Sequence, residues 1–144
     1  MLKGIPSILP PDLLKILMEM GHGDELVIGD GNFPAASMAQ RLVRCDGHPV
    51  APLLEAVLGL FPLDTFVDSP VALMAVVDGG GDEPPIWQTY RDIIERQSPD
   101  ATGIDLVERF AFYERARRAY AIVATGESAL YANVILTKGV VVDS

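Results

Sequence analysis

Short runs of adjacent apolar residues alternate along this chain with segments in which apolar residues recur every three or four positions. The first pattern predicts buried strands, and the second predicts helices that pack one apolar face against a core. Strands interleaved with helices are typical of an α/β layer fold, in which helices cover a parallel or mixed sheet. This alternation limits the choice of fold more than any other feature of the sequence.

The expected elements follow from apolar spacing and from turn residues at their ends. Pro10 and Pro11 before Asp12 start the first helix, and Gly21 ends it. Helices are expected over residues 11–20, 34–39, 51–60, 87–96 and 110–118. Strands are expected over residues 25–29, 41–45, 71–77, 104–107, 120–125 and 131–137, with a loop of glycines and prolines over 79–85.

The last two expected strands are joined by a short connection around Gly126 to Ser128, so we expect them to pair as an antiparallel hairpin. The length of 144 residues supports one domain over residues 1–144, because about 100 to 200 residues form a typical domain. The sequence therefore predicts a single-domain α/β fold with a mixed β-sheet flanked by helices.

The chain is acidic, with 11 Lys and Arg against 20 Asp and Glu and a formal net charge of -9. Nucleic acids and anionic membrane surfaces attract basic proteins, so neither is an expected partner. No apolar run approaches the roughly 18 residues that span a bilayer, and the N-terminus lacks a secretory signal pattern. Cys45 is the one cysteine, which excludes an internal disulfide and agrees with a cytoplasmic location.

No motif supports a cofactor or metal site. The glycines at 79–81 lack the Gly-Lys-Ser/Thr continuation of a phosphate-binding loop and form no dinucleotide fingerprint. Cys45 and the two histidines have no metal-ligand spacing, so a buried structural thiol is expected. The remaining polar residues suit acid–base chemistry and hydrogen bonding on a polyhydroxylated molecule.

His22 is the first candidate for proton transfer. It lies between Gly21 and Gly23 at the junction of a helix and a strand, which leaves its ring accessible. The alternative is a surface histidine near a helix C-terminus, where the helix dipole favours it. His48 lies in a turn before the third expected helix and is expected to be an ordinary exposed loop residue.

Two aspartates follow apolar segments. Asp30 comes directly after the expected strand 25–29, and α/β folds commonly place ligand contacts at the carboxyl ends of strands. Its alternative role is in a turn, since Asp-Gly-Asn is a strong turn signal. Asp64 lies in a similar loop after Leu63, where the alternative is a cap of a helix or turn.

The C-terminal half adds polar groups near apolar ones. Tyr131 and Asn133 are two apart on an expected strand, so their hydroxyl and amide would share one face. Phe110 and Tyr113 are neighbours on one face of an expected helix, where core packing explains most of the pattern.

Several blocks in order, covering nearly the whole chain, resemble the RbsD/FucU family of sugar mutarotases and especially its L-fucose mutarotase branch. The blocks are Met20-Gly21-His22-Gly23-Asp24-Glu25, Asp30 with Asn32-Phe33-Pro34-Ala35, Leu63-Asp64-Thr65, Glu108-Arg109-Phe110, Phe112-Tyr113-Glu114-Arg115, and Tyr131-Ala132-Asn133. The resemblance implies an RbsD-like layered fold.

The resemblance also implies an isomerase that interconverts the α and β anomers of a free monosaccharide through the open-chain aldehyde, without metal or nucleotide. It makes His22 the catalytic acid, because a histidine exchanges protons near neutral pH. Asp30, Arg109, Tyr131 and Asn133 would contact the sugar, with Arg109 and Asp30 orienting hydroxyls and Tyr131 relaying or stabilising a proton. Asp64 and Tyr113 match the fucose branch as further sugar contacts.

Two alternatives stay open at this point. One is the ribose branch, which interconverts pyranose and furanose forms, although Arg109 and the residues after it favour fucose. The other is a non-catalytic module that binds or senses a monosaccharide in the same pocket.

Similar proteins form ring-shaped, often decameric assemblies, so we expect a homo-oligomer. A regular strand over 25–29 would separate its ends by about 16 Å at roughly 3.3 Å per residue, too far for His22 and Asp30 to flank one monosaccharide. Either the chain bends there or neighbouring subunits share each site.

Overall fold

The computed structural model of the chain describes residues 1–77 and 81–143. Its helices are α1 (Pro11–Glu19), α2 (Ala35–Met38), α3 (Val50–Leu58), α4 (Pro85–Gln97) and α5 (Arg109–Arg118). Its strands are β1 (Glu25–Gly29), β2 (Leu42–Cys45), β3 (Val71–Met74), β4 (Ile104–Val107), β5 (Ala121–Thr125) and β6 (Val134–Thr137). Each expected helix and strand has a counterpart in this order, so the predicted alternation is confirmed.

The strands form one six-stranded mixed sheet in the order β2-β5-β1-β6-β3-β4. Strand β6 is antiparallel to both of its neighbours, β1 and β3. Val134 of β6 lies opposite Ile28 of β1 on one side and opposite Leu73 of β3 on the other. The other pairs, β1 with β5, β2 with β5 and β3 with β4, are parallel. The prediction of a mixed sheet is therefore confirmed.

The predicted hairpin between the last two strands is wrong, because β1 lies between β5 and β6. The connection after β5 crosses the end of β1 instead of turning back beside β5. Gly31 donates its amide hydrogen to the Glu127 carbonyl (2.8 Å), and Asp30 donates its own to the Asn133 side chain (2.7 Å). These long-range hydrogen bonds cannot be predicted from the local sequence, and they hold the connecting segment across the end of β1, so that β6 pairs on the other side of β1 from β5.

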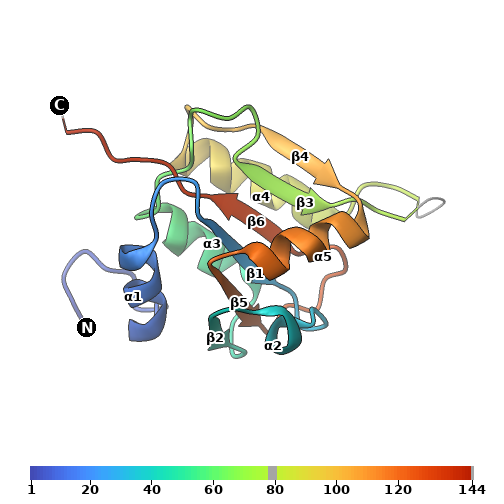
Figure 1. Cartoon of the computed structure of the whole chain (residues 1–144), viewed down its shortest axis with the longest axis horizontal. Coiled ribbons are helices and arrows are strands. Elements are labelled where there is room, and N and C mark those ends of the chain that lie inside the picture. The colour runs from blue at the N-terminus through green and yellow to red at the C-terminus, as the bar shows by residue number, and fades with distance from the viewer. Residues whose placement is uncertain (78–80, 144) are drawn as a thin grey trace.

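Helices cover both faces of the sheet (Figure 1). On one face, residues of α1, α3 and α4 pack against alternate strand residues such as Leu26, Ile28 and Leu73. On the other, α5 and the segment around α2 pack against Val27, Ala72 and Ile135 through side chains that include Phe33, Ala35 and Phe112. The period-two alternation of the strands thus divides the core into two layers.

Two strands are each three residues shorter than expected. The strand expected over 71–77 ends at Met74. The next residue, Ala75, donates its amide hydrogen to the carbonyl of Val107 (2.8 Å), and Val107 is the last residue of the neighbouring strand β4. The strand expected over 131–137 begins at Val134, because Tyr131 has a φ of 56° and lies in a turn. Tyr131 and Asn133 therefore do not share the face of a strand, and that prediction is wrong. In the glycine loop, Gly79 and Gly80 lie outside the described residues.

The sheet has two edges that matter for the site. Strands β1 to β5 end at what we call the carboxyl edge, where the antiparallel β6 begins, and they start at the opposite amino edge, where β6 ends. Within residues 1–77 and 81–143, none of the helices combines the length and apolar character needed to cross a membrane.

Candidate functional site

Asp30 and Asn133 meet at the carboxyl edge, at the centre of the sheet. Asp30 follows the last residue of β1, and Asn133 precedes the first residue of β6. Both side chains are buried, with 7% and 6% of their residue surfaces exposed. The Asp30 carboxylate accepts a hydrogen bond from the amide of Asn32 (2.9 Å) and is close enough to the amide of Ala132 for that amide to stabilise its charge. The family resemblance implied that both residues contact the sugar, and the structure brings them together.

Burial is the main influence on the Asp30 carboxyl group and raises its pKa above the ordinary value, and the nearby charge of Glu127 acts in the same direction. The hydrogen bond from the Asn32 amide and the nearby amides of Ala132 and Phe33 oppose this rise in pKa. A carboxyl group held in this way retains its proton more readily than an exposed one, which suits a role in proton exchange.

Tyr131 lies in the turn before β6. Its hydroxyl oxygen accepts a hydrogen bond from the Val77 amide (3.3 Å), and its side chain is half-buried. Together with Val76, Ile86 and Leu130 it lines a cavity of about 640 Å³. Small-molecule sites are typically clefts of roughly 300–1,000 Å³, so this cavity is large enough for a monosaccharide.

Arg109 is the first residue of α5, on the same edge. Glu108 caps the helix by accepting hydrogen bonds from the amides of Phe110 and Ala111, both 3.0 Å. This cap fixes the backbone position of Arg109 at the start of the helix. The guanidinium carbon lies 4.7 Å from the centre of the Phe110 ring. Arg109 lines a second cavity of about 460 Å³, bounded like the first by Val76.

Tyr113 lies one helical turn after Arg109. Its ring packs 5.8 Å from Phe33 and 6.4 Å from Phe110, measured between ring centres. The expected pairing of Phe110 with Tyr113 on one helical face is confirmed. Core packing does not explain Phe110, however, because 62% of it is exposed, and Phe112 fills the core instead.

His22 lies at the opposite, amino edge. Its Nε2 is 3.1 Å from Oδ1 of Asp64, and the same oxygen accepts a hydrogen bond from the Phe66 amide (3.0 Å). The His22 side chain is 46% exposed, as its flanking glycines predicted, whereas that of Asp64 is only 5% exposed. Asp64 thus also acts as the turn cap considered in the sequence analysis.

The Phe66 amide, and after it the His22 ring, lower the pKa of Asp64 below its ordinary value, against the opposing effect of burial. The Asp64 carboxyl group therefore stays charged, beside the imidazole of His22, down to a lower pH than an exposed aspartate would.

The end of β6 holds the His22 and Asp64 loops together. Gly23 donates its amide hydrogen to the Lys138 carbonyl (2.8 Å), and Asp64 donates its own to the Thr137 carbonyl (3.0 Å). At Gly139 a Cβ atom would lie 2.7 Å from the Leu63 carbonyl oxygen, so only glycine allows this close approach.

The residues expected in one site thus form two groups within a chain. His22 and Asp64 lie at the amino edge; Asp30, Asn133, Tyr131, Arg109 and Tyr113 lie at the carboxyl edge. Strand β1 is regular and runs between His22 and Asp30, so the alternative of a bent chain is wrong.

Sequence reasoning missed three aromatic residues near these groups. Phe66 has its ring 5.4 Å from that of His22 and is 74% exposed. Trp87 and Tyr90, on α4, donate hydrogen bonds to the carbonyls of Tyr131 and Ala132. An apolar residue two positions after a candidate aspartate was the available signal for Phe66, whereas nothing local marks the other two.

Across residues 1–77 and 81–143, no group of three or more His, Cys, Asp or Glu side chains is arranged to hold a metal ion. Cys45 is buried and forms no disulfide, and burial raises the pKa of its thiol. His48 is exposed in its loop.

The model of the RbsD / FucU transport protein family matches residues 3–141. The chain belongs to the RbsD/FucU family. It is 50% identical over 145 residues to a fucose mutarotase of Homo sapiens, covering 96% of this chain and 94% of that one. It is 48% identical over 140 residues to an L-fucose mutarotase of Actinobacillus pleuropneumoniae, covering 97% of each.

A solved structure of this RbsD/FucU type has nearly the same fold. It is the fucose mutarotase of Streptococcus pneumoniae in complex with L-fucose, which is 57% identical and superposes with a TM-score of 0.93 over 98% of this chain and 100% of that one. The RbsD-like layered fold expected from the sequence is therefore confirmed.

The carboxyl groups of Asp30 and Asp64 should affect the free energy of unfolding in opposite ways as pH changes. Asp64 has a lowered native pKa, so its charge stabilises the fold above the ordinary value of 3.8, and this contribution is lost as pH falls through the native value. Asp30 has a raised native pKa, so its negative charge destabilises the fold. This destabilisation is complete above the native pKa and absent below the ordinary value of 3.8.

Urea unfolding between about pH 6 and pH 3 checks this prediction. The stability advantage of the parent over Asp64→Asn should shrink as pH falls. Relative to the parent, Asp30→Asn should lose stability over the same range. Slopes of the same sign for both variants would contradict the prediction.

Proposed function

We propose that this protein is an L-fucose mutarotase that interconverts the α and β anomers of the free sugar. The observation that carries the proposal is the exposed His22 ring held by the buried Asp64 carboxylate, in a chain about half identical to fucose mutarotases over nearly its full length. We also propose a cytoplasmic location, since the one cysteine is buried and free.

The reaction breaks the bond between the anomeric carbon and the ring oxygen. The ring oxygen gains a proton, the anomeric hydroxyl loses one, and an aldehyde forms. Rotation about the bond between C1 and C2 exposes the other face of the carbonyl, and the reverse steps close the ring as the other anomer. No net electron or atom is exchanged, so the protein needs to supply only proton donors and acceptors.

His22 supplies the first of these groups. With Nε2–H donating to Asp64, the ring presents Nδ1 to the sugar as the atom that takes and returns a proton. The Asp64 carboxylate stabilises the imidazolium that forms when Nδ1 is protonated. In this state His22 is the catalytic acid for the ring oxygen.

The carboxyl-edge residues bind and orient the sugar. Asp30 and Asn133 offer a carboxylate and an amide, and Arg109 donates hydrogen bonds to hydroxyls. The Tyr131 phenol relays a proton on the side opposite His22. Tyr113, packed beside Phe33, lines the same edge as a further sugar contact.

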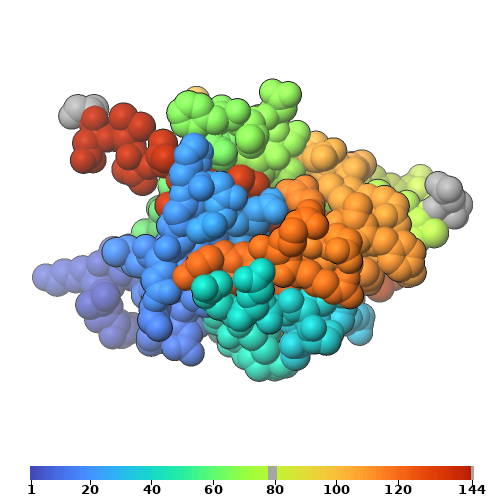
Figure 2. Space-filling view, viewed as in Figure 1, coloured from blue at the N-terminus to red at the C-terminus, as the bar shows by residue number. Residues whose placement is uncertain are grey.

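These two groups act together if one subunit supplies His22 and Asp64 and a neighbour supplies the carboxyl edge. The five residues of β1 separate the groups within a chain, by about 16 Å at roughly 3.3 Å per residue. Both chain ends project from the body of the molecule (Figure 2). They expose the apolar side chains of Met1, Leu2, Val141 and Val142, and exposed apolar surface of this kind is typical of a protein that assembles with further copies. We propose a ring-shaped homo-oligomer, with a decamer as the expected size.

Saturation-transfer NMR on equilibrated L-fucose tests the proposed activity. Catalytic amounts of the protein should transfer saturation between the two anomeric proton signals at a rate proportional to protein concentration. D-Ribose run in parallel should exchange its pyranose and furanose signals far more slowly. Faster ribose exchange would favour the ribose branch, and binding of fucose without faster exchange would favour a sensor module.

The variant His22→Gln should lower the exchange rate by about 10²- to 10⁴-fold, the usual contribution of a positioned acid–base group. Glutamine keeps a hydrogen-bonding group but cannot titrate near neutral pH. His48→Gln is the matched control, because His48 is exposed in a loop, and it should keep the parent rate. Circular dichroism and assembly mass should stay unchanged in both; near-normal exchange in His22→Gln would assign the acid to another residue.

Mixing His22→Gln with Asp30→Asn tests the shared site. Once subunits exchange, roughly a quarter of the sites would combine an intact His22 with an intact Asp30 by random pairing, so activity should recover toward that level. Sedimentation should first give a mass well above the 15.5 kDa of one chain. A monomer at micromolar concentration, or no recovery despite proven subunit exchange, would contradict the proposal.

A further inference from the structure

The backbone at Tyr131 is held in an unfavourable conformation. Within the described residues it is the one residue other than glycine with a positive φ, at 56°. Side chains with a Cβ atom are uncommon there, and such residues persist only where their surroundings hold them in place. The contacts around Tyr131 should therefore include the ones that hold it.

Two side chains of α4 bind the carbonyl groups of this turn. Trp87 donates its indole N–H to the carbonyl of Tyr131 (2.8 Å), and Tyr90 donates its hydroxyl to the carbonyl of Ala132 (2.7 Å). Only 4% of Trp87 and none of Tyr90 is exposed. The two donors are three residues apart on one face of the helix, so a single rigid element holds two consecutive peptide groups.

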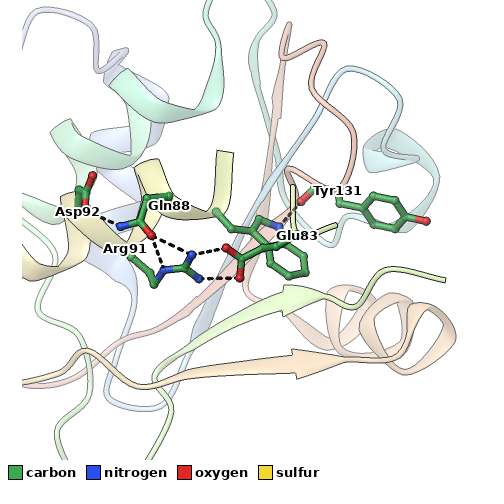
Figure 3. Close-up of polar contacts among 6 residues, drawn as sticks. Glu83, Gln88, Arg91, Asp92 and Tyr131 are labelled. Atoms are coloured by element: carbon green, nitrogen blue, oxygen red, sulfur yellow. Dashed lines mark hydrogen bonds and ion pairs between the residues drawn. The ribbon is translucent and has the colours of Figure 1, made fainter. Parts of the chain in front are cut away.

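The start of α4 is itself tied down on its outer surface. Arg91 pairs with Glu83 and also donates to Gln88 (3.1 Å), which in turn donates to Asp92 (2.9 Å) (Figure 3). Ile93 and Ile94 anchor the rest of the helix in the core. The helix can therefore act as a fixed support for the turn.

Asp30 holds the other side of the same turn. Asp30 donates its amide hydrogen to the Asn133 side chain (2.7 Å), and its carboxylate lies near the Ala132 amide, which stabilises its charge. Figure 3 shows the Tyr131 ring directed away from α4, and its hydroxyl meets the Val77 amide at 3.3 Å. The turn is thus clamped between α4 and the end of β1, and the clamp sets the direction of the phenol.

We propose that Trp87 and Tyr90 are positioning residues that act through Tyr131, holding its phenol where it exchanges a proton with the sugar. This inference rests on the proposed mutarotase function. It adds to that function two buried aromatic residues that touch neither the sugar nor the reacting atoms.

The variants Tyr90→Phe and Trp87→Phe test the inference, since each removes one hydrogen-bond donor and keeps an aromatic ring. A displacement of about 1 Å can slow a reaction by roughly 100-fold, so we expect kcat to fall by about 10- to 100-fold, with much less change in KM. Tyr120→Phe is the matched control, because the Tyr120 hydroxyl donates only to Glu19 (2.9 Å) on the surface. It should keep the parent kcat.

The decisive measurement repeats Tyr90→Phe in a Tyr131→Phe background. If Tyr90 acts through the Tyr131 phenol, its removal should lower kcat no further once that phenol is gone. A merely structural role would lower kcat by the same factor in both backgrounds and would overturn the inference. Parent-like kcat in both α4 variants would also overturn it.

A spectroscopic measurement separates this inference from the proposed function. The chain has four tyrosines, so fluorine NMR of 3-fluorotyrosine-labelled protein can be assigned from the Tyr→Phe variants. The Tyr131 signal should shift in Trp87→Phe and stay in place in Tyr120→Phe. If the parent fails to exchange the anomers of fucose, the proposed function is contradicted. An unmoved Tyr131 signal in Trp87→Phe contradicts the positioning role instead. If Tyr90→Phe does not fold, Trp87→Phe replaces it in the kinetic measurements.

Discussion

The carboxyl edge depends on the contacts between Asp30 and the segment Ala132–Asn133, above all the hydrogen bond from the Asp30 amide to the Asn133 side chain. They join the end of β1 to the start of β6, across 103 positions of sequence between Asp30 and Asn133. Because a buried donor or acceptor without a partner destabilises the fold, these groups strongly favour one path for the chain after β5. The same contacts place β6 beside β1 and set the turn that carries Tyr131.

A second consequence concerns charge. The chain keeps two buried carboxyl groups with opposite pKa shifts at opposite edges of one sheet: raised for Asp30 and lowered for Asp64. Burial dominates at Asp30, and hydrogen bonds dominate at Asp64. One environment therefore favours a carboxyl group that can hold a proton, and the other favours a charged carboxylate beside a histidine. Under the proposed function, a sugar between two subunits would lie between these environments.

The candidate site was partly predictable from the sequence. His22 and Asp30 stand out because glycines flank the first and a strand precedes the second, and both signals are local. The pairing of His22 with Asp64 has no such signal, since 42 positions separate them and the contact exists only where both loops attach to the end of β6. Trp87 and Tyr90 were missed for the same reason, because their partners lie more than 40 positions away along the chain.

Local periodicity alone was enough to predict the order and type of the helices and strands, because the spacing of apolar residues reflects which side of each element is buried. It also placed Asp30 at the end of a strand. Strand neighbours were decided by tertiary structure, and the expected hairpin between β5 and β6 was wrong because hydrogen bonds from Asp30 and Gly31 draw the connecting segment across β1. Tertiary structure likewise placed Tyr131 in a turn and not in the expected strand, because the carbonyls of this turn accept hydrogen bonds from α4 and the Asn133 side chain accepts one from the end of β1. Sequence patterns report burial, which is local, whereas strand order and site geometry depend on which distant polar groups satisfy one another.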